Sequence, residues 1–106
     1  MAVDATQAAG SAVRGTSVTA AIRKASQLTG AKFSYLLATA KVESNLDIDA
    51  RSPAGAHGLL QVLPSTGRRI ARQIGIRNFQ TSTLTDAEAN LKIGTYYFSR
   101  LVKQFG

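Results

Sequence analysis

Apolar residues recur at intervals of three and four along several stretches of this chain, and this period constrains its fold more than any other feature. In the first stretch they fall on one face, at Val18, Ala21, Ile22, Ala25 and Leu28. This spacing is typical of an amphipathic helix, and no strand pattern of comparable strength occurs elsewhere. The sequence therefore predicts an all-α fold, a small helical domain.

Glycine and proline mark where the predicted helices begin and end. Gly30 is expected to end the first helix, because glycine readily adopts the left-handed backbone that closes many helices. A second helix is predicted over residues 34–44. Pro64 suits the first turn of a third helix over residues 65–74, which Gly75 would close.

The last helix has the clearest pattern. Thr85 and Glu88 have the spacing of a capping box, and Asp86 adds negative charge at the positive end of the helix dipole. Apolar or small residues then recur at helical period, at Ala87, Leu91, Gly94, Phe98, Leu101 and Phe105. Before this helix, residues 45–57 are predicted to form a loop and residues 58–63 a short helical turn.

A length of 106 residues allows one small domain, predicted over residues 17–106. Residues 1–16 are rich in Ala, Gly, Ser and Thr without periodicity, and we expect them to form a flexible tail. The N-terminus lacks the basic start and hydrophobic block of a secretory signal, and no apolar run approaches the roughly 20 residues that span a membrane. With no cysteine and one histidine, His57, no metal site is predicted, and His57 is expected in an exposed loop.

Thirteen Lys and Arg residues against six Asp and Glu give a net charge of +7. Such a charge favours polyanionic partners, namely nucleic acid, an anionic lipid surface or an acidic cell-wall polymer. The basic residues are scattered, except for a group formed by Arg68, Arg69, Arg72 and Arg77. No aromatic residue interleaves with that group as a base-stacking surface requires, so we expect no specific nucleic-acid binding.

Glu43 is a carboxylate in an apolar setting. On a helix it would lie on the same face as Leu36 and Ala40, and would therefore continue their apolar stripe. At the rim of such a stripe a carboxylate loses part of its hydration, which favours its neutral form and suits a general acid. The same spacing also fits an exposed glutamate at a helix end, paired with Lys41 or Lys92, and spacing alone leaves both interpretations open.

Ordinary glycoside hydrolysis uses two carboxylates that flank the bond. Asp47 and Asp49 are the candidates for a second carboxylate near Glu43. In the stretch "NLDIDA", however, aspartate is equally natural as a turn former, and we favour that interpretation for both.

A longer motif surrounds Glu43. It consists of Glu43-Ser44, then Ser52, Gly55, Gly58-Leu59-Leu60-Gln61, Pro64 and Thr66, with Asn90 and Gly94 in the last helix. Together at these intervals, the residues resemble the catalytic domain of the soluble lytic transglycosylases, which are related in fold to goose-type lysozymes. The resemblance runs from about residue 17 to residue 106 and implies part of a lysozyme-like helical fold.

The resemblance implies cleavage of the β-1,4 bond between N-acetylmuramic acid and N-acetylglucosamine in the glycan strands of peptidoglycan, in the cell envelope or periplasm. Glu43 would protonate the glycosidic oxygen and then accept a proton from the muramic C6 hydroxyl, which closes on C1 as a 1,6-anhydro sugar. Substrate contacts would come from Ser44, Ser52, Gly58, Leu59 and Gln61. The chemistry needs no metal and no cofactor.

This chain departs from the family pattern in one respect: it stops before an Ala-Tyr-Asn segment and the further helices that the family's domain normally carries. The alternative expectation is a truncated or chimeric helical fragment, catalytically impaired or inactive. Such a fragment would bind glycan weakly, or form homo-oligomers through exposed apolar surface. Within the enzyme interpretation, hydrolysis of the goose-type lysozyme kind is the second candidate, and it would give a reducing end instead of an anhydro sugar.

Overall fold

The computed structural model describes residues 18–105, apart from the side chain of Phe105. Its elements are a helix over residues 18–29, α2 (Phe33–Ser44), α3 (Pro64–Ile74), the 3₁₀ helix η1 (Thr81–Thr85) and α4 (Ala87–Phe105). Within this range there is no strand, only two isolated β-bridges in the loop between α2 and α3. The predicted all-α class is therefore confirmed. The tail predicted over residues 1–16 lies outside the described residues.

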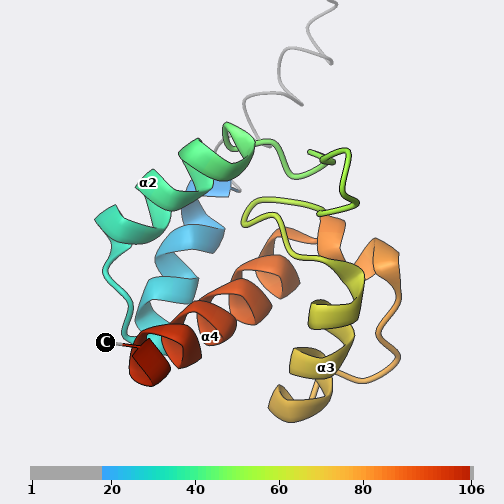
Figure 1. Ribbon diagram of the computed structural model, residues 1–106. Coiled ribbons are helices and arrows are strands. Elements are labelled where there is room, and N and C mark those ends of the chain that lie inside the picture. Colours follow the sequence, from blue (N-terminus) through green and yellow to red (C-terminus); the bar gives the residue numbers. More distant parts are fainter. Residues whose placement is uncertain (1–17, 106) are drawn as a thin grey trace, which may run out of the picture.

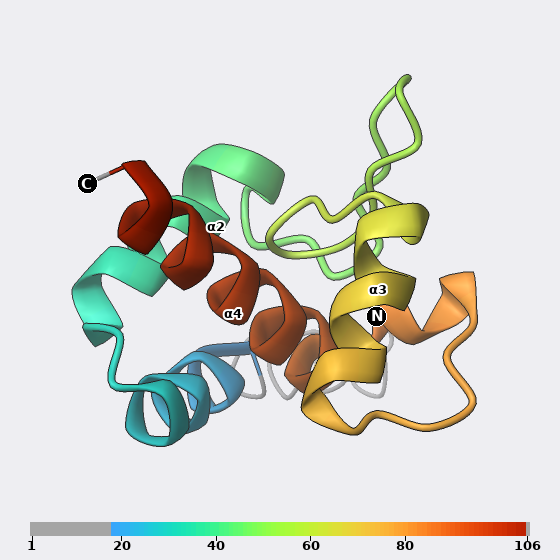
Figure 2. The ribbon, with the colours of Figure 1, turned by 60° about the horizontal axis from the view of Figure 1, so that its bottom comes forward.

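The central element of the fold is α4 (Figure 1). It crosses the molecule between the helix over 18–29 and α2 on one side and α3 on the other, and the turned view in Figure 2 shows the same arrangement. Its neighbours α3 and η1 contact each other as well as α4. No described helix has the combination of length and apolar character needed to cross a membrane.

One hydrophobic core joins all of these elements. Its largest apolar side chains are at most 1% exposed and come from every helix and from the loop: Ile22, Leu36, Leu59, Leu60, Ile70, Leu84, Leu91 and Ile93. Each side chain of this size contributes about 1.5–3 kcal/mol when it is fully buried. Because Leu59 and Leu60 belong to the loop, the loop is anchored in the same core as the helices.

Local chemistry set the helix ends largely as predicted. Gly30 and Gly75 both close helices with a φ of +82°, and Pro64 is the first residue of α3. Leu28 lies in the predicted helix, but it is 64% exposed and does not join the core. Residues 27–30 are all exposed, so the last turn of this helix extends past the core.

The capping box predicted at the start of α4 is wrong. Thr85 belongs to η1, and the cap is Asp86, whose Oδ2 accepts the Ala89 N–H at 2.9 Å. Glu88 instead forms an ion pair with Lys24, with 3.1 Å between Oε1 and Nζ. Aspartate is at least as good an N-cap as threonine, so the helix begins after Asp86 instead of one residue earlier.

Candidate active site

Glu43 lies in the last turn of α2, which the buried residues Leu36, Ala40 and Ser44 anchor in the core. The Glu43 side chain itself is exposed, so the partial burial predicted for this carboxylate is wrong. Steps of four residues from Leu36 lead to Ala40 and then to Ser44, and Ser44 therefore takes the buried position at the helix end. Glu43 lies beside that stripe and meets solvent.

Two consecutive left-handed residues end α2. They are Asn45, with a φ of 53°, and Leu46, with a φ of 64°. This conformation is unfavourable for leucine, and packing of Leu46 against the core compensates for it. Asp47 follows and accepts the Asp49 N–H through Oδ1 at 2.9 Å, as predicted for a turn former. The chain direction directly after Glu43 is thus fixed by packing and by a side-chain hydrogen bond.

The loop then folds back on itself in a tight turn. His57 and Val62 pair as an antiparallel bridge and exchange two backbone hydrogen bonds, of 2.9 and 3.0 Å. Within the turn, over residues 58–61, both Gly58 (φ 80°) and Gln61 (φ 52°) have left-handed backbones. A right-handed helical turn contains no such residues. The helical turn predicted for this segment is therefore wrong.

Side chains of the predicted site hold the loop together. The Ser52 Oγ accepts the Ala56 N–H at 3.0 Å, which closes the first fold of the loop. The Gln61 Nε2 donates to the carbonyls of Ala50 at 3.2 Å and Gly58 at 2.9 Å, which ties the turn to the preceding segment. Both side chains are half-buried, so each keeps some surface toward solvent.

The side chain of Asn90, which lies in α4, holds this turn against α4 through hydrogen bonds. It is fully buried; its Oδ1 accepts the Leu60 N–H at 2.8 Å, and its Nδ2 donates to the carbonyls of His57 and Leu84, both at 2.9 Å. The exposure predicted for His57 is wrong, since this residue is 7% exposed. The bridge to Val62 and the hydrogen bond from Asn90 hold His57 against the core.

Two glycines allow the turn and α4 to approach this closely. A Cβ at Gly58 would lie 2.2 Å from the Leu84 carbonyl oxygen and 2.3 Å from the Asn90 Nδ2. A Cβ at Gly94 would lie 2.6 Å from Leu60 Cδ1. These separations are far below van der Waals contact, so larger residues at either position would push the turn away from α4.

The predicted site residues fall into three groups, namely the exposed Glu43, the half-buried Ser52 and Gln61, and the buried Ser44, Gly58 and Leu59. The Ser44 hydroxyl donates to the Ala40 carbonyl at 2.8 Å, within its own helix. Of these residues, Glu43, Ser52 and Gln61 have side chains that a ligand can reach without a rearrangement of the fold. Within the described residues, no three His, Cys, Asp or Glu side chains gather as a metal site requires.

Sequence reasoning placed Asn90 in the motif but gave it no role. The available signal was its position four residues before Gly94, on the face of α4 that also carries apolar residues. A polar side chain on a buried helix face must find partners, and its partners here are two loop backbone groups at least 30 residues away in sequence and the Leu84 carbonyl of η1.

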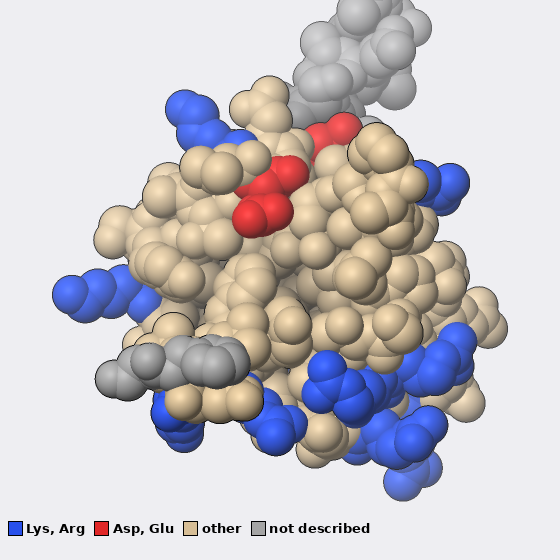
Figure 3. Space-filling view, in the orientation of Figure 1, with Lys and Arg blue, Asp and Glu red and all other residues tan. Residues whose placement is uncertain are grey.

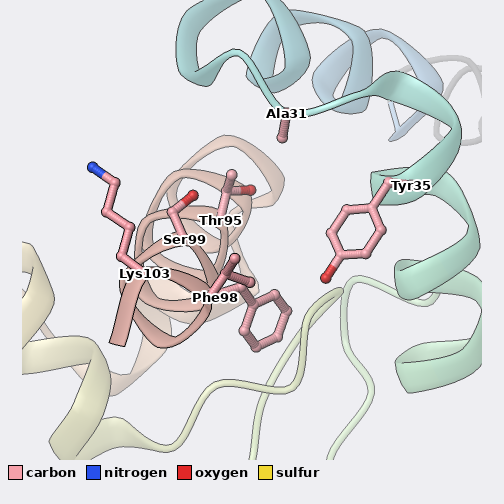
Figure 4. Close-up of a pocket in the computed structure, with 7 residues that line it drawn as sticks. Ala31, Tyr35, Thr95, Phe98, Ser99 and Lys103 are labelled. Carbon is pink, nitrogen blue, oxygen red and sulfur yellow. The ribbon is translucent and has the colours of Figure 1, made fainter. Parts of the chain in front are cut away.

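A groove of about 340 Å³ separates the start of α2 from the C-terminal half of α4 (Figure 4). Its walls include Tyr35, Phe98 and Val102, which make it largely apolar. The Thr95 hydroxyl is buried and has no hydrogen-bond partner among the described residues. None of the residues predicted to bind substrate lines this groove.

Charge is unevenly distributed over the surface. On the face drawn in Figure 3, acidic side chains lie toward the top, near the end of α2 and the loop after it, and basic side chains gather at the lower right over α3. The exposed carboxylates of this region include Glu43, Asp47 and Asp49, and α3 carries Arg68, Arg69 and Arg72.

Comparison with known sequences gives a consistent result. A family model described as the transglycosylase SLT domain matches residues 20–106. The chain is 36% identical over 74 residues to the soluble lytic murein transglycosylase of Escherichia coli K12, and 35% identical to that of Salmonella typhimurium. Each match covers 69% of this chain and 12% of the relative, so the chain spans a small part of those proteins.

Solved structures share the fold. The 70-kDa soluble lytic transglycosylase of Escherichia coli superposes with a TM-score of 0.71, and the Pseudomonas aeruginosa lytic transglycosylase Slt, solved as an inactive glutamate-to-glutamine mutant, with a TM-score of 0.74. A third structure, the 70-kDa enzyme in complex with bulgecin A, has a TM-score of 0.72. All three are 31% identical in sequence, and each match covers 81% of this chain and 14% of the solved one. The predicted lytic-transglycosylase-like helical fold is therefore confirmed.

Proposed function

Because this chain belongs to the transglycosylase SLT domain family, we propose that it cleaves the β-1,4 bond between N-acetylmuramic acid and N-acetylglucosamine in peptidoglycan. The observation that carries the proposal is the placement of Glu43, an exposed carboxylate at the end of a helix anchored in the core. A glycan strand can reach this carboxylate without any opening of the fold. The protein would then act in the cell envelope, where peptidoglycan lies.

Glu43 would act alone, first as acid and then as base. Protonated Glu43 donates its proton to the glycosidic oxygen as the bond from that oxygen to C1 breaks, and N-acetylglucosamine leaves with a hydroxyl group. The Glu43 carboxylate then accepts the proton of the muramic C6 hydroxyl as that oxygen bonds to C1. The product is a 1,6-anhydro sugar, and Glu43 ends protonated as it began.

One observation supports a single acid. Asp47, a near neighbour in sequence, is engaged as a turn former, with its Oδ1 bound to the Asp49 N–H. The Pseudomonas aeruginosa relative was solved as an inactive glutamate-to-glutamine mutant, which supports a requirement for a glutamate. In this proposal a bound glycan covers Glu43 and displaces its water, which supplies the burial that the free protein lacks.

The remaining motif residues would have two kinds of role. Ser52 and Gln61, which are half-buried, would contact the glycan. Ser44, Gly58 and Leu59, which are buried, would act as positioning residues that keep α2 and the turn in register. The glycan strand is thus expected to lie across the end of α2 and the loop over residues 50–62.

A second candidate is a helical fragment that carries the motif with impaired catalysis. No described residue donates a hydrogen bond to Glu43, although transition-state stabilisation depends on preorganised donors. Such a fragment would bind glycan weakly, or form homo-oligomers through the apolar groove beside Tyr35 and Val102. Light scattering over a range of protein concentrations would detect the oligomers as a rise in mean mass.

Release of soluble fragments from purified peptidoglycan tests the proposed function. We expect Glu43→Gln to reduce the rate of release by about 100-fold or more, since a general acid contributes at least that much. The matched control is Glu88→Gln, which makes the same chemical change at an exposed glutamate of α4 and should leave the rate unchanged. Equal rates for Glu43→Gln and the parent protein, both folded by circular dichroism, would contradict the role of Glu43.

A further inference from the structure

A basic concavity of about 600 Å³ lies beside the C-terminal half of α3. Three arginines line it, Arg68 and Arg72 from α3 and Arg77 from the segment that follows, together with Phe79. Figure 3 shows basic side chains gathered over this part of the molecule. For Arg68, Arg69 and Arg72 the sequence left two interpretations open, a solvated helix face or a contact with an anionic cell wall.

The local fold brings these arginines to one concavity. Arg68 and Arg72 are one helical turn apart and therefore lie on the same face of α3. Gly75, with a φ of +82°, ends the helix and reverses the chain, so that Arg77 reaches the same hollow. The Arg68 guanidinium lies 5.4 Å from the centroid of the Phe79 ring, a cation–π contact that restricts its orientation.

The positive charge of the concavity is not neutralised by the described part of the chain. No aspartate or glutamate lines it, and none of Arg68, Arg72 and Arg77 forms an ion pair with a described residue. Three like charges around one hollow repel each other, and a bound anion would remove that repulsion. The concavity is therefore electrostatically suited to an anion with more than one negative charge.

We propose that this concavity is a binding site for phosphate groups, independent of the chemistry proposed for Glu43. Guanidinium groups bind phosphate through paired N–H donors, and the tetrahedral oxygens of phosphate accept donors from several directions. A carboxylate is planar, has one charge and is satisfied by one arginine fork. Three arginines from two segments thus favour phosphate, carried either by a soluble molecule or by a lipid headgroup.

Isothermal titration calorimetry with sodium pyrophosphate at low salt tests this site. We expect saturable binding that weakens at least tenfold in the double variant Arg72→Gln/Arg77→Gln. The matched control is Arg69→Gln with Arg51→Gln, which removes the same charge from exposed positions outside the concavity and should change the affinity less than twofold. Equal weakening in both double variants would contradict a defined site.

Two further probes identify the ligand class. Succinate, a dicarboxylate, should bind at least tenfold more weakly than pyrophosphate, and equal affinities would overturn the preference for phosphate. Cosedimentation with phosphatidylcholine vesicles containing phosphatidic acid distinguishes the phosphate source. Vesicle binding that the concavity variants abolish supports a lipid headgroup, pyrophosphate binding alone supports a soluble ligand, and absence of both contradicts the proposal.

Discussion

Asn90 makes three buried hydrogen bonds with backbone groups, two in the loop between α2 and α3 and one in η1, and these bonds hold the turn over residues 58–61 and η1 against α4. Loss of this side chain should cost more than the three hydrogen bonds themselves contribute, because each of the three buried partner groups would be left unpaired. Gly58 and Gly94 make this contact possible by leaving room for it. At the scale of residues, the loop beside Glu43 thus depends on α4.

Substitution of Asn90 should therefore be costly. We expect Asn90→Ala to lower the free energy of unfolding by about 3 kcal/mol, measured by urea denaturation and circular dichroism. Gln104→Ala, an exposed position on the same helix, serves as the control and should change it by less than about 0.5 kcal/mol. A change at Asn90 as small as that of the control would show that the three hydrogen bonds contribute little.

Gly94→Ala should lower the unfolding free energy, although replacement of glycine by alanine usually raises it in a helix. Alanine normally stabilises a helix interior by about 1 kcal/mol relative to glycine. Here the new Cβ would lie 2.6 Å from Leu60 Cδ1 and 2.9 Å from Leu60 Cβ, and Leu60 is 1% exposed. We therefore expect a loss of about 2 kcal/mol in unfolding free energy. In a Leu60→Ala background, which removes Cδ1 but keeps Cβ, the same substitution should cost clearly less, and an undiminished loss would point to a cause other than this contact.

At the scale of elements, the sequence predicted correctly those features that neighbouring residues determine, such as helix ends, and missed those that depend on distant contacts. Pro64 and Gly75 act through their own backbone preferences, and α3 begins and ends where they indicated. The fold class and the four helices followed in the same way from periodicity. The burial of His57 could not be predicted, because it results from Asn90, 33 residues away in sequence.

The sequence predicted the helix that carries Glu43, but not the exposure of the Glu43 side chain. The motif placed Glu43 on the last turn of a helix, as observed, but helical spacing did not distinguish the buried stripe from its edge. Exposure at a helix end depends on what packs there, and that is a property of the tertiary structure. The same competition between neighbouring residues decided the start of α4, where Thr85 and Asp86 were both able to cap.

The cap of α4 gives a prediction at this scale. Asp86→Ala should lower the unfolding free energy by about 1 kcal/mol, because the Ala89 N–H loses its acceptor. Glu88→Gln removes one partner of an ion pair whose side chains are 56% and 57% exposed, and should cost less than about 0.5 kcal/mol. Chemical denaturation of both variants measures the difference. A larger effect at Glu88 than at Asp86 would favour the originally predicted capping box.

At the scale of the whole molecule, two charged features are separated. The exposed carboxylate Glu43 lies at the end of α2, and the arginine concavity lies beside the C-terminal half of α3. They share no residue, so substitutions in one should leave the other unaffected.

The most direct test of the central claim is the identity of the bond-forming oxygen in the product. Peptidoglycan would be digested in water enriched in heavy oxygen, and the released muropeptides analysed by mass spectrometry. If Glu43 directs attack by the muramic C6 hydroxyl, the parent protein releases 1,6-anhydro-muropeptides without heavy oxygen, and Glu43→Gln releases none. Reducing-end products that carry heavy oxygen would show that water attacks instead, and would contradict the single-glutamate transglycosylase mechanism.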